Sequence, residues 1–294
     1  MNRWKGLVLL LLLVSASSAW AGEEARILSE TIQLQVADGF MAEEEYYRAI
    51  TEYLRFRFLF PDSERGDYAL LQIGRAYLRG GEYARAARNF QTLGERFPVS
   101  PLVDRARYLE GLAAWKGKDL ARAKGVFGEL AAQAPPSDQT PRALAGLALI
   151  RLEEDDPEEA RETLQRFLTT YPDHTRAEQF READKKLREY QVLPQKSEVL
   201  AGVLSGILPG AGYAYAEEFA TGFMSLGVNG AFIAAAWAAF ANGLEAVGIL
   251  AGGIGLPFYI GNIYGSVLAA RKWNQAVKKE ARDPLYSLLD FVFE

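Results

Sequence analysis

The sequence predicts an all-α protein with two parts: an α-solenoid of about four helix pairs plus a capping helix, followed by a small transmembrane helical module. Three observations carry this prediction. A 37-residue repeat ends at Pro172, a charged amphipathic segment follows it, and two long uncharged runs come after Val199. The expected boundaries are a signal peptide at 1–21, the solenoid with its capping helix at 22–192, a linker at 193–198, a membrane module of two to three helices at 199–272, and a basic or amphipathic tail at 273–294.

The repeat is marked by four prolines that stand 37 residues apart. An alanine precedes each proline by twelve positions, and bulky apolar residues precede it by eight and by five. The positions are Pro61, Pro98, Pro135 and Pro172; Ala49, Ala86, Ala123 and Ala160; Tyr53, Phe90, Phe127 and Leu164; and Phe56, Leu93, Leu130 and Phe167. Chance does not keep so many positions in phase over four copies, so the chain contains an internal repeat.

The second copy, Asp67–Ser100, resembles the tetratricopeptide repeat (TPR). Its pattern is met by Leu70, Ile73, Gly74, Tyr77, Gly81, Tyr83, Ala86, Phe90, Leu93 and Pro98. Ala86 suits a close helix crossing, and Pro98 ends the second helix because proline lacks an N–H and clashes with the preceding turn. The long spacing and the A-x3-F-x2-[FL]-x3-[FY]-P ending look like the periplasmic TPR proteins of the outer-membrane assembly and Tol–Pal coordinator type.

The other copies depart from this pattern at single positions. Glu110 stands where the third copy should have an apolar residue, and Ala148 stands at the glycine position of the fourth. The first copy keeps mainly its second helix, 45–60, after a first helix expected at 23–36. After the last copy, 175–192 predicts a capping helix with one apolar stripe and one charged face. The stripe consists of Ala177, Phe180, Ala183, Leu187 and Tyr190.

The composition excludes several kinds of chemistry. The chain has 294 residues, a net charge of −5, no cysteine and one histidine. Without cysteine there is no disulfide, thiolate zinc site or cysteine nucleophile, and the charge does not favour nucleic acid. His174, in the turn YPDHT, is interpreted as a solvated turn residue. Because no metal-spaced cluster, nucleophile motif or phosphate loop is visible, we expect neither an enzyme nor a cofactor.

Residues 1–21 have the features of a secretory signal. Arg3 and Lys5 precede the apolar run Leu7–Val14, and Ala19-Trp20-Ala21 forms a small–x–small cleavage site. Cleavage is expected after Ala21. The alternative is an uncleaved anchor, although the run is far shorter than the ~20 residues that cross a bilayer. In either case the following domain is exported.

Two uncharged runs predict transmembrane helices. Phe219–Ala241 has 23 residues and Ala246–Ala270 has 25, and about 20 suffice to span a bilayer. A shorter run, Val199–Ala216, is interrupted by Pro209-Gly210 and is either a third span or a re-entrant hairpin. Basic residues near membrane ends favour the cytoplasm, so those after the last span favour three spans. They are Arg271, Lys272, Lys278, Lys279 and Arg282.

Glycines recur at a spacing of four in this module, which lets helix backbones approach closely. The spaced glycines are Gly202, Gly206 and Gly210, Gly248 and Gly252, and Gly261 and Gly265. They indicate packing within one chain, with a homo-oligomer through Gly-xxx-Gly faces, or a pore, as the alternative. The polar groups in or beside the spans are Asn229, Asn242, Glu245 and Asn262.

The stretch Ser205–Gly222 resembles small bacterial membrane modules related to the TM2 family, including a DUF5683-like group. The P-G-x-G-x2-Y turn of those modules is matched by Pro209, Gly210, Gly212 and Tyr215. Glu217 departs from the glycine that usually follows the tyrosine by two positions. The resemblance implies residence in a membrane. The tail 283–294, DPLYSLLDFVFE, is expected to lie on the membrane surface as a short amphipathic helix.

The TPR resemblance also implies a peptide groove lined by the first helix of each repeat. Carried over by phase, the groove consists of Tyr68, Leu71, Arg75, Leu78, Arg79, Arg105, Tyr108, Leu112, Trp115, Lys116, Arg142 and Leu149. Arginine forks bind carboxylates in a bidentate way, and aromatic rings supply rigid apolar contact. The hypothesis is a peptide partner with acidic or C-terminal carboxylate groups; the alternative is a solvated arginine-rich face.

Together these features predict a TPR adaptor or scaffold fixed in a bacterial inner membrane, with a periplasmic TPR domain that binds protein or peptide partners and a C-terminal module that contacts lipid. The alternative is an accessory or pore-forming component of a membrane transport system, with the repeats as its docking domain. Broken helices with polar groups at mid-membrane would favour transport, and Gly255-Leu256-Pro257 is a candidate break.

Overall fold

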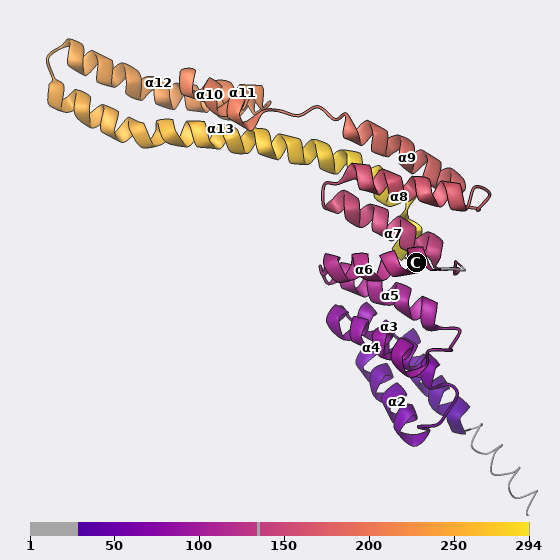
Figure 1. Cartoon of the computed structure of the whole chain (residues 1–294). Coiled ribbons are helices and arrows are strands. Elements are labelled where there is room, and N and C mark those ends of the chain that lie inside the picture. Colours follow the sequence, from indigo (N-terminus) through magenta and orange to yellow (C-terminus); the bar gives the residue numbers. More distant parts are fainter. Residues whose placement is uncertain (1–28, 134–135, 294) are drawn as a thin grey trace, which may run out of the picture. The chain divides into compact units, whose positions relative to one another are not determined.

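The computed structural model describes residues 29–133 and 136–293 (Figure 1). The signal peptide predicted for 1–21 and the repeat proline at 135 lie outside these residues. The described residues divide by packing into two compact units: one holds those up to Pro172 together with Asp290–Phe293, and the other is Asp173–Leu289. The units are described separately below.

The first unit is a stack of antiparallel helices, as the repeat predicts. Helical residues 29–42 precede α2 (Tyr46–Leu59), α3 (Gly66–Arg79), α4 (Tyr83–Arg96), α5 (Val103–Lys116), α6 (Leu120–Ala132), α7 (Thr140–Glu153) and α8 (Pro157–Thr170), and η1 (Asp290–Phe293) is a short 3-10 helix. From α2 to α8, each pair of consecutive helices packs together. The predicted solenoid of about four helix pairs is therefore confirmed.

The in-phase repeat positions form the core of this unit. All four alanines of the repeat are fully buried, and so are the bulky residues eight and five positions before each proline. In the second copy the ring of Phe90 lies against Gly74, where an added Cβ would stand 2.5 Å from the ring. Gly111 and Phe127 repeat this contact at 2.6 Å in the third copy. In these two copies, a glycine on the first helix therefore leaves space for an aromatic ring on the second helix.

The turn inside each repeat has the same backbone geometry in all four copies. One residue there adopts a left-handed conformation: Glu44 (φ 60°), Gly81 (φ 79°), Lys118 (φ 65°) and Asp155 (φ 63°). The next residue donates its N–H to a carbonyl five positions back, over 2.8–2.9 Å, which satisfies an end carbonyl of the first helix. Three of the four copies place a non-glycine residue in this conformation.

The turn between repeats is also in phase, and it includes the single histidine. Ser63, Ser100 and Ser137 each accept a hydrogen bond from the N–H two residues on. His174 stands 37 residues after Ser137 and accepts from the N–H of Arg176 through Nδ1, over 3.1 Å. The histidine expected as a solvated turn residue therefore has a structural role at this turn.

Glu110, the apolar-site exception of the third copy, is buried and paired. Its Oε1 accepts from Nη2 of Arg122 at 2.7 Å and from Nε at 3.0 Å. Burial raises the pKa of Glu110, while the Arg122 hydrogen bond and charge oppose that rise. A buried carboxylate is tolerated because the arginine neutralises it.

The second unit contains α9 (Ala177–Gln191), α10 (Glu198–Ile207), α11 (Ala211–Tyr215), α12 (Phe219–Ala241) and α13 (Glu245–Leu288). α12 and α13 lie side by side, α10 and α11 pack on each other and on α13, and α9 also packs on α13 (Figure 1). The five stripe residues expected on the capping helix are all buried. By packing, this helix groups with the membrane module rather than with the repeats.

Among the described residues two helices, α12 and α13, are long and apolar enough to cross a membrane. Their large side chains face outward: Phe223 is 75% exposed and Trp237 78%. α10 has only 10 residues, a rise of about 15 Å against a hydrocarbon core of about 30 Å. The run at 199–216 therefore has the form of a hairpin of α10 and α11, the second of the two alternatives that the sequence left open.

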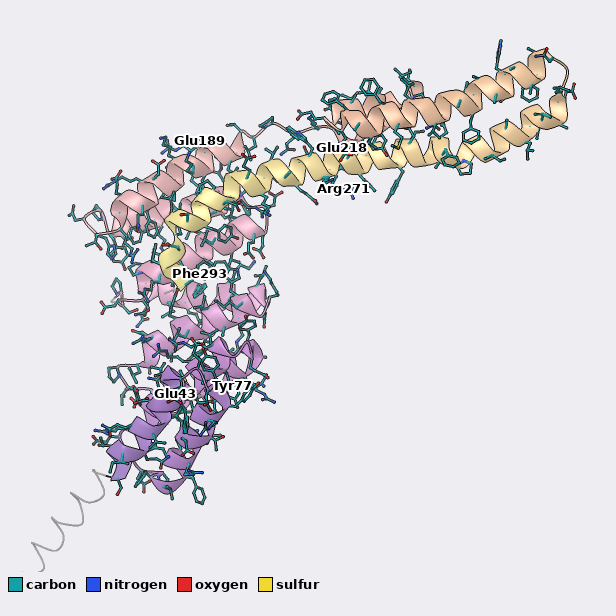
Figure 2. The ribbon with its side chains drawn as sticks, turned by 180° about the vertical axis from the view of Figure 1, so that it is seen from behind. Glu43, Tyr77, Glu189, Glu218, Arg271 and Phe293 are labelled. Carbon is teal, nitrogen blue, oxygen red and sulfur yellow. The ribbon has the colours of Figure 1, made fainter. Side chains whose placement is uncertain are left out.

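Two of the five basic residues that follow the last apolar run are paired with carboxylates. Arg271, labelled in Figure 2, pairs with Glu198 at 2.7 Å, and Lys272 pairs with Glu218 at 3.5 Å. The candidate helix break at Gly255-Leu256-Pro257 is not present, because α13 runs as one helix through Pro257. The tail also differs from a membrane-surface helix: 273–288 continues α13, and 290–293 packs in the repeat unit.

Candidate functional site

The eleven residues predicted for the peptide groove before Leu149 lie on the first helices of three repeats: α3, α5 and α7. We call this set the groove face. Leu71, Tyr108, Leu112 and Trp115 are buried, Arg79, Arg105 and Lys116 are exposed, and the others are half-buried; Leu149 is buried as well. The face therefore combines buried apolar side chains with exposed cationic ones.

Three arginines gather at the α3–α5 side of the groove face. Arg75 and Arg79 lie one turn apart on α3, and Arg105 lies on α5, which contacts α3. Burial lowers the pKa of Arg75, and the charges of Arg79 and Arg105 lower it further. The recorded side-chain partner of Arg75 is the amide oxygen of Gln72 at 3.2 Å. Among the residues the structure describes, none of the three forms an ion pair with a carboxylate. Clustered cations of this kind attract acidic groups.

Tyr68 is fixed at the edge of the groove face by a carboxylate that the sequence did not single out. Its hydroxyl donates to Asp38 Oδ1 at 2.9 Å, and the hydroxyl of Tyr53 donates to the same oxygen. Burial and this hydrogen bond raise the pKa of Tyr68. A cavity of about 360 Å³ adjoins these groups. The lining residues are Thr31, Leu34, Gln35, Asp38, Arg65 and Tyr68.

The α5–α7 side of the groove face is occupied by the chain's own end. The Tyr108 hydroxyl donates to the carbonyl oxygen of Val292. The ring of Phe293, which is labelled in Figure 2, lies 5.2 Å from that of Trp115, centroid to centroid. Lys116 Nζ lies 5.9 Å from the centre of the Phe293 ring. Phe291 and Val292 are 1% and 0% exposed. The apolar run F-V-F near the chain end was the available signal for this contact.

The predicted membrane turn is held by buried hydrogen bonds. Gly210 has φ 88°, and its N–H donates to Asn262 Oδ1 at 2.9 Å. Gly212 donates to Ser205 Oγ at 3.0 Å, and an added Cβ at Gly210 or Gly212 would collide with a neighbouring backbone carbonyl oxygen. The Tyr215 hydroxyl accepts from the N–H of Ser197 at 3.0 Å, and Pro209 is buried. The motif is thus a close-packed backbone turn.

Glu217, the departure from that motif, keeps the geometry that glycine would favour. Its φ is 67°, and its Oε1 accepts from Lys196 Nζ at 2.7 Å. That hydrogen bond lowers the pKa of Glu217. The Lys196 ammonium also lies 4.2 Å from the centre of a Trp273 ring. These polar and aromatic groups gather where α12 begins, as expected at a membrane–water interface.

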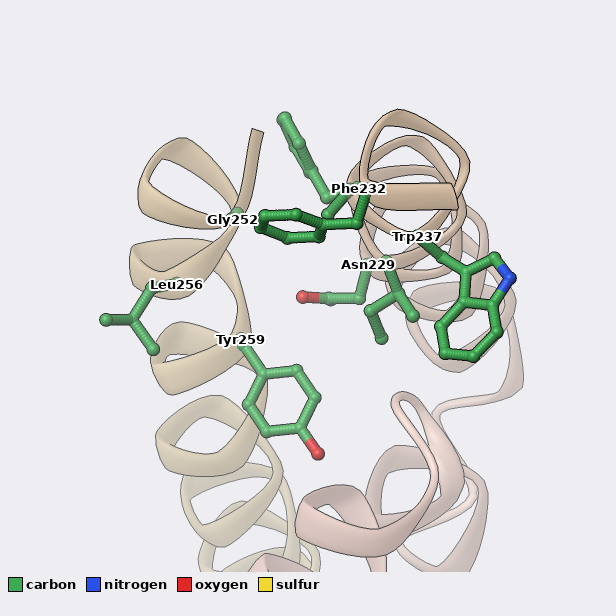
Figure 3. Close-up of a pocket in the computed structure, with 10 residues that line it drawn as sticks. Asn229, Phe232, Trp237, Gly252, Leu256 and Tyr259 are labelled. Carbon is green, nitrogen blue, oxygen red and sulfur yellow. The ribbon is translucent and has the colours of Figure 1, made fainter. Parts of the chain in front are cut away.

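A cavity of about 370 Å³ lies between α12 and α13 (Figure 3). Its walls are almost entirely apolar and include Phe232, Trp237 and Tyr259. Asn229 is 3% exposed, and its Oδ1 has no hydrogen-bond partner. The other mid-helix polar groups satisfy one another: Asn262 Oδ1 also accepts from Ser225 Oγ at 2.7 Å. Within the described residues, no group of three or more His, Asp or Glu side chains is placed to hold a metal ion.

Comparison with known proteins identifies the repeats. Residues 68–100 and 142–174 match the tetratricopeptide repeat family model, so the second and fourth copies are tetratricopeptide repeats. Domains of this class typically bind protein partners, which makes the repeat unit a candidate protein-interaction scaffold.

No curated relative matches the sequence. A solved tetratricopeptide repeat protein from Parabacteroides merdae is similar in structure, with a TM-score of 0.45 and 15% identity over 87% of this chain and 98% of that chain.

Proposed function

We propose that this protein is a membrane-tethered scaffold of the bacterial cell envelope. The repeat unit binds protein or peptide partners in the exported compartment, and the C-terminal module holds it in the inner membrane. Its periplasmic character and its likeness to outer-membrane assembly and Tol–Pal coordinator proteins belong to this proposal. So does the TM2-like nature of the module.

The observation that supports partner binding is the arginine cluster of the groove face. Arg75 and Arg79 on α3 and Arg105 on α5 form no ion pair with a carboxylate among the described residues. Keeping three cations close together is unfavourable unless an anion relieves the repulsion. An acidic peptide supplies that anion, and arginine binds carboxylates with two parallel hydrogen bonds.

Two features support the membrane tether. α12 and α13 expose large apolar side chains along their length, and patches of that size require a membrane or a partner. The bundle also has two charged pairs, Arg271 with Glu198 and Lys272 with Glu218, directly after the uncharged run of α13 ends at Ala270. A transport function has less support, because α13 is continuous through Pro257 and a broken helix would be expected.

Site-specific photo-cross-linking in cells tests partner binding. A photo-reactive residue at Arg79 or Arg105 should capture the same partner, and Arg75→Glu with Arg79→Glu should abolish capture from position 105. The matched control is Arg88→Glu with Arg96→Glu, two exposed arginines on α4, which should leave capture unchanged. Equal capture from a probe at Arg88 would contradict the groove assignment, and recovery in the soluble periplasmic fraction would contradict the tether.

A further inference from the structure

The segment Asp290–Phe293 packs on repeats that lie far from it in sequence. Val292 and Tyr108, joined by a hydrogen bond, are 184 positions apart, and η1 also packs on α7. A 3-10 helix of four residues is too short to be stable alone. The repeats therefore hold this segment in place.

The contacts define what this part of the groove face recognises. Two aromatic side chains flank one aliphatic residue, and Phe291 and Val292 are fully buried. Trp115 lies against the ring of Phe293, and Lys116 places its ammonium near that ring's face. Cations and aromatic faces attract each other. An apolar peptide with rings at alternate positions fits this arrangement.

The polar contact adds a requirement on the peptide backbone. The Tyr108 hydroxyl donates to a main-chain carbonyl, so this hydrogen bond can form whatever the side chain at that peptide position. The Arg142 guanidinium lies 5.9 Å from the centre of the Tyr108 ring. Burial raises the pKa of Tyr108 although Arg142 opposes that shift, so the hydroxyl keeps its proton and remains a donor. Side-chain selectivity therefore comes from the aromatic contacts.

We propose that Tyr108, Trp115, Lys116 and Arg142 form a binding site for short aromatic–aliphatic–aromatic peptides, that the chain's own Asp290–Phe293 is its resident occupant, and that a protein partner carries the same pattern and displaces it. The proposal rests on the scaffold function above and names the partner's chemistry. The arginine cluster on α3 and α5 lies outside the occupied part and takes the partner's acidic residues. A partner is thus a peptide with an aromatic pair beside acidic residues.

The test uses the full chain in detergent and a fluorescent peptide of residues 283–294, DPLYSLLDFVFE. Phe291→Ala with Phe293→Ala should empty the site, and this double variant should bind the peptide at least tenfold more tightly than wild type does. A peptide with both phenylalanines replaced by alanine should not bind. The control is Phe58→Ala, which removes an 84% exposed ring on α2 and should leave the affinity of wild type unchanged.

Two further variants locate the peptide. In the emptied chain, Trp115→Ala should abolish binding, and the gentler Tyr108→Phe should weaken it several-fold without loss of helix content. Equal binding by wild type and the emptied chain, or binding indifferent to Trp115→Ala, would overturn the proposal. A wild-type dimer that becomes monomeric in the double variant would also overturn it, because the occupant would then be a second copy's tail.

The outcome is separable from that of the scaffold proposal. If the peptide binds as expected but cross-linking from Arg79 and Arg105 captures nothing, the scaffold function fails while the aromatic site stands. If a partner is captured and the peptide does not compete with it, the aromatic site fails while the scaffold function stands.

Discussion

At the scale of single residues, one position in the turn inside each repeat has a left-handed backbone conformation. An L-residue in this conformation costs roughly 1–2 kcal/mol relative to the right-handed one, and glycine avoids that cost. The second copy has Gly81 at this position, whereas the first, third and fourth have Glu44, Lys118 and Asp155. The chain therefore retains local strain at three of its four turns.

Lys118→Gly and Asp155→Gly should each stabilise the protein. The relief of strain exceeds the extra chain entropy that glycine loses on folding, for a net gain of about 0.5–1 kcal/mol each. Denaturant unfolding followed by circular dichroism measures the change. Gly81→Ala is the reciprocal control and should destabilise; a stabilising Gly81→Ala would contradict the argument.

The glycine–ring contacts predict a compensated pair. Gly74→Ala should destabilise by about 1–3 kcal/mol, as overpacking does, because the new Cβ would meet the Phe90 ring at 2.5 Å. Adding Phe90→Leu should recover part of that loss. The fourth copy already contains this pair, as Ala148 and Leu164. Additive losses in a double-mutant cycle would show that the two residues do not share space.

Glu110 predicts an unusual pH response. Its pKa in the folded protein is raised above the ordinary 4.5, so its contribution to stability is largest below that value and is lost as the pH rises through the raised pKa. Glu110→Leu should therefore be equal to or more stable than wild type at neutral pH. The difference in unfolding free energy between Glu110→Leu and wild type should become smaller as the solution is acidified. A difference that grows on acidification would show that the pKa of Glu110 is not raised in the folded protein.

At the scale of elements, one side chain clamps the α10–α11 hairpin to α13. Asn262 accepts from Gly210 N–H and donates to the Ser205 carbonyl oxygen, both over 2.9 Å. Ser266 adds a bond to the Ala201 carbonyl oxygen at 3.1 Å. Where water is absent, backbone groups at a turn must find such partners. The hairpin is therefore stable only as part of the bundle.

Asn262→Leu should loosen the hairpin. The substitution leaves the Gly210 N–H unpaired, at a cost of about 1–3 kcal/mol. Limited trypsin digestion in mild detergent should then cut more quickly after Lys196, whose backbone is otherwise held by two hydrogen bonds with the Asn274 side chain. The control is Asn242→Leu at the exposed end of α12. Unchanged digestion in Asn262→Leu would mean that the glycine packing alone holds the hairpin.

At the scale of the whole molecule, the proposed membrane tether predicts a topology. The repeats and Asp290–Phe293 belong to one compact unit, so a membrane-tethered chain would keep both on the same side of the bilayer. That condition requires an even number of crossings between them, and we expect α12 and α13 to supply two crossings and the hairpin none.

Single-cysteine labelling tests this topology directly, because the native chain has no cysteine. Thr92→Cys on α4 and Asp283→Cys near the end of α13 should react with a membrane-impermeant maleimide added from the exported side. Asn242→Cys, between the spans, should be protected until the membrane is opened. Labelling of positions 92 and 242 from the exported side, with 283 protected, would indicate three crossings and exclude the two-span arrangement.

Much of the repeat unit was predictable from the sequence, because helix pairing is local. A 37-residue period dictates which residues face each other across adjacent helices, and its alanines and rings are buried as expected. The amphipathic stripe of α9 and the long apolar run of α12 follow from the same local periodicity. The eleven residues of the groove face lie on the helices that their phase in the repeat predicted. Their burial, and the contacts that some of them make with Asp290–Phe293, could not be predicted in this way.

What only the tertiary structure decided are the long-range contacts. Nothing local to Val292 indicates Tyr108, and nothing local to Asn262 indicates Gly210. The pairing of Arg271 with Glu198 likewise joins residues 73 positions apart. The periodicity of the sequence reflects how helices that are adjacent in the chain pack together. Contacts between segments that are distant in the chain depend instead on the path of the whole folded chain. The sequence by itself determined the solenoid and the apolar helices, and the folded chain decided that its own end occupies part of the groove.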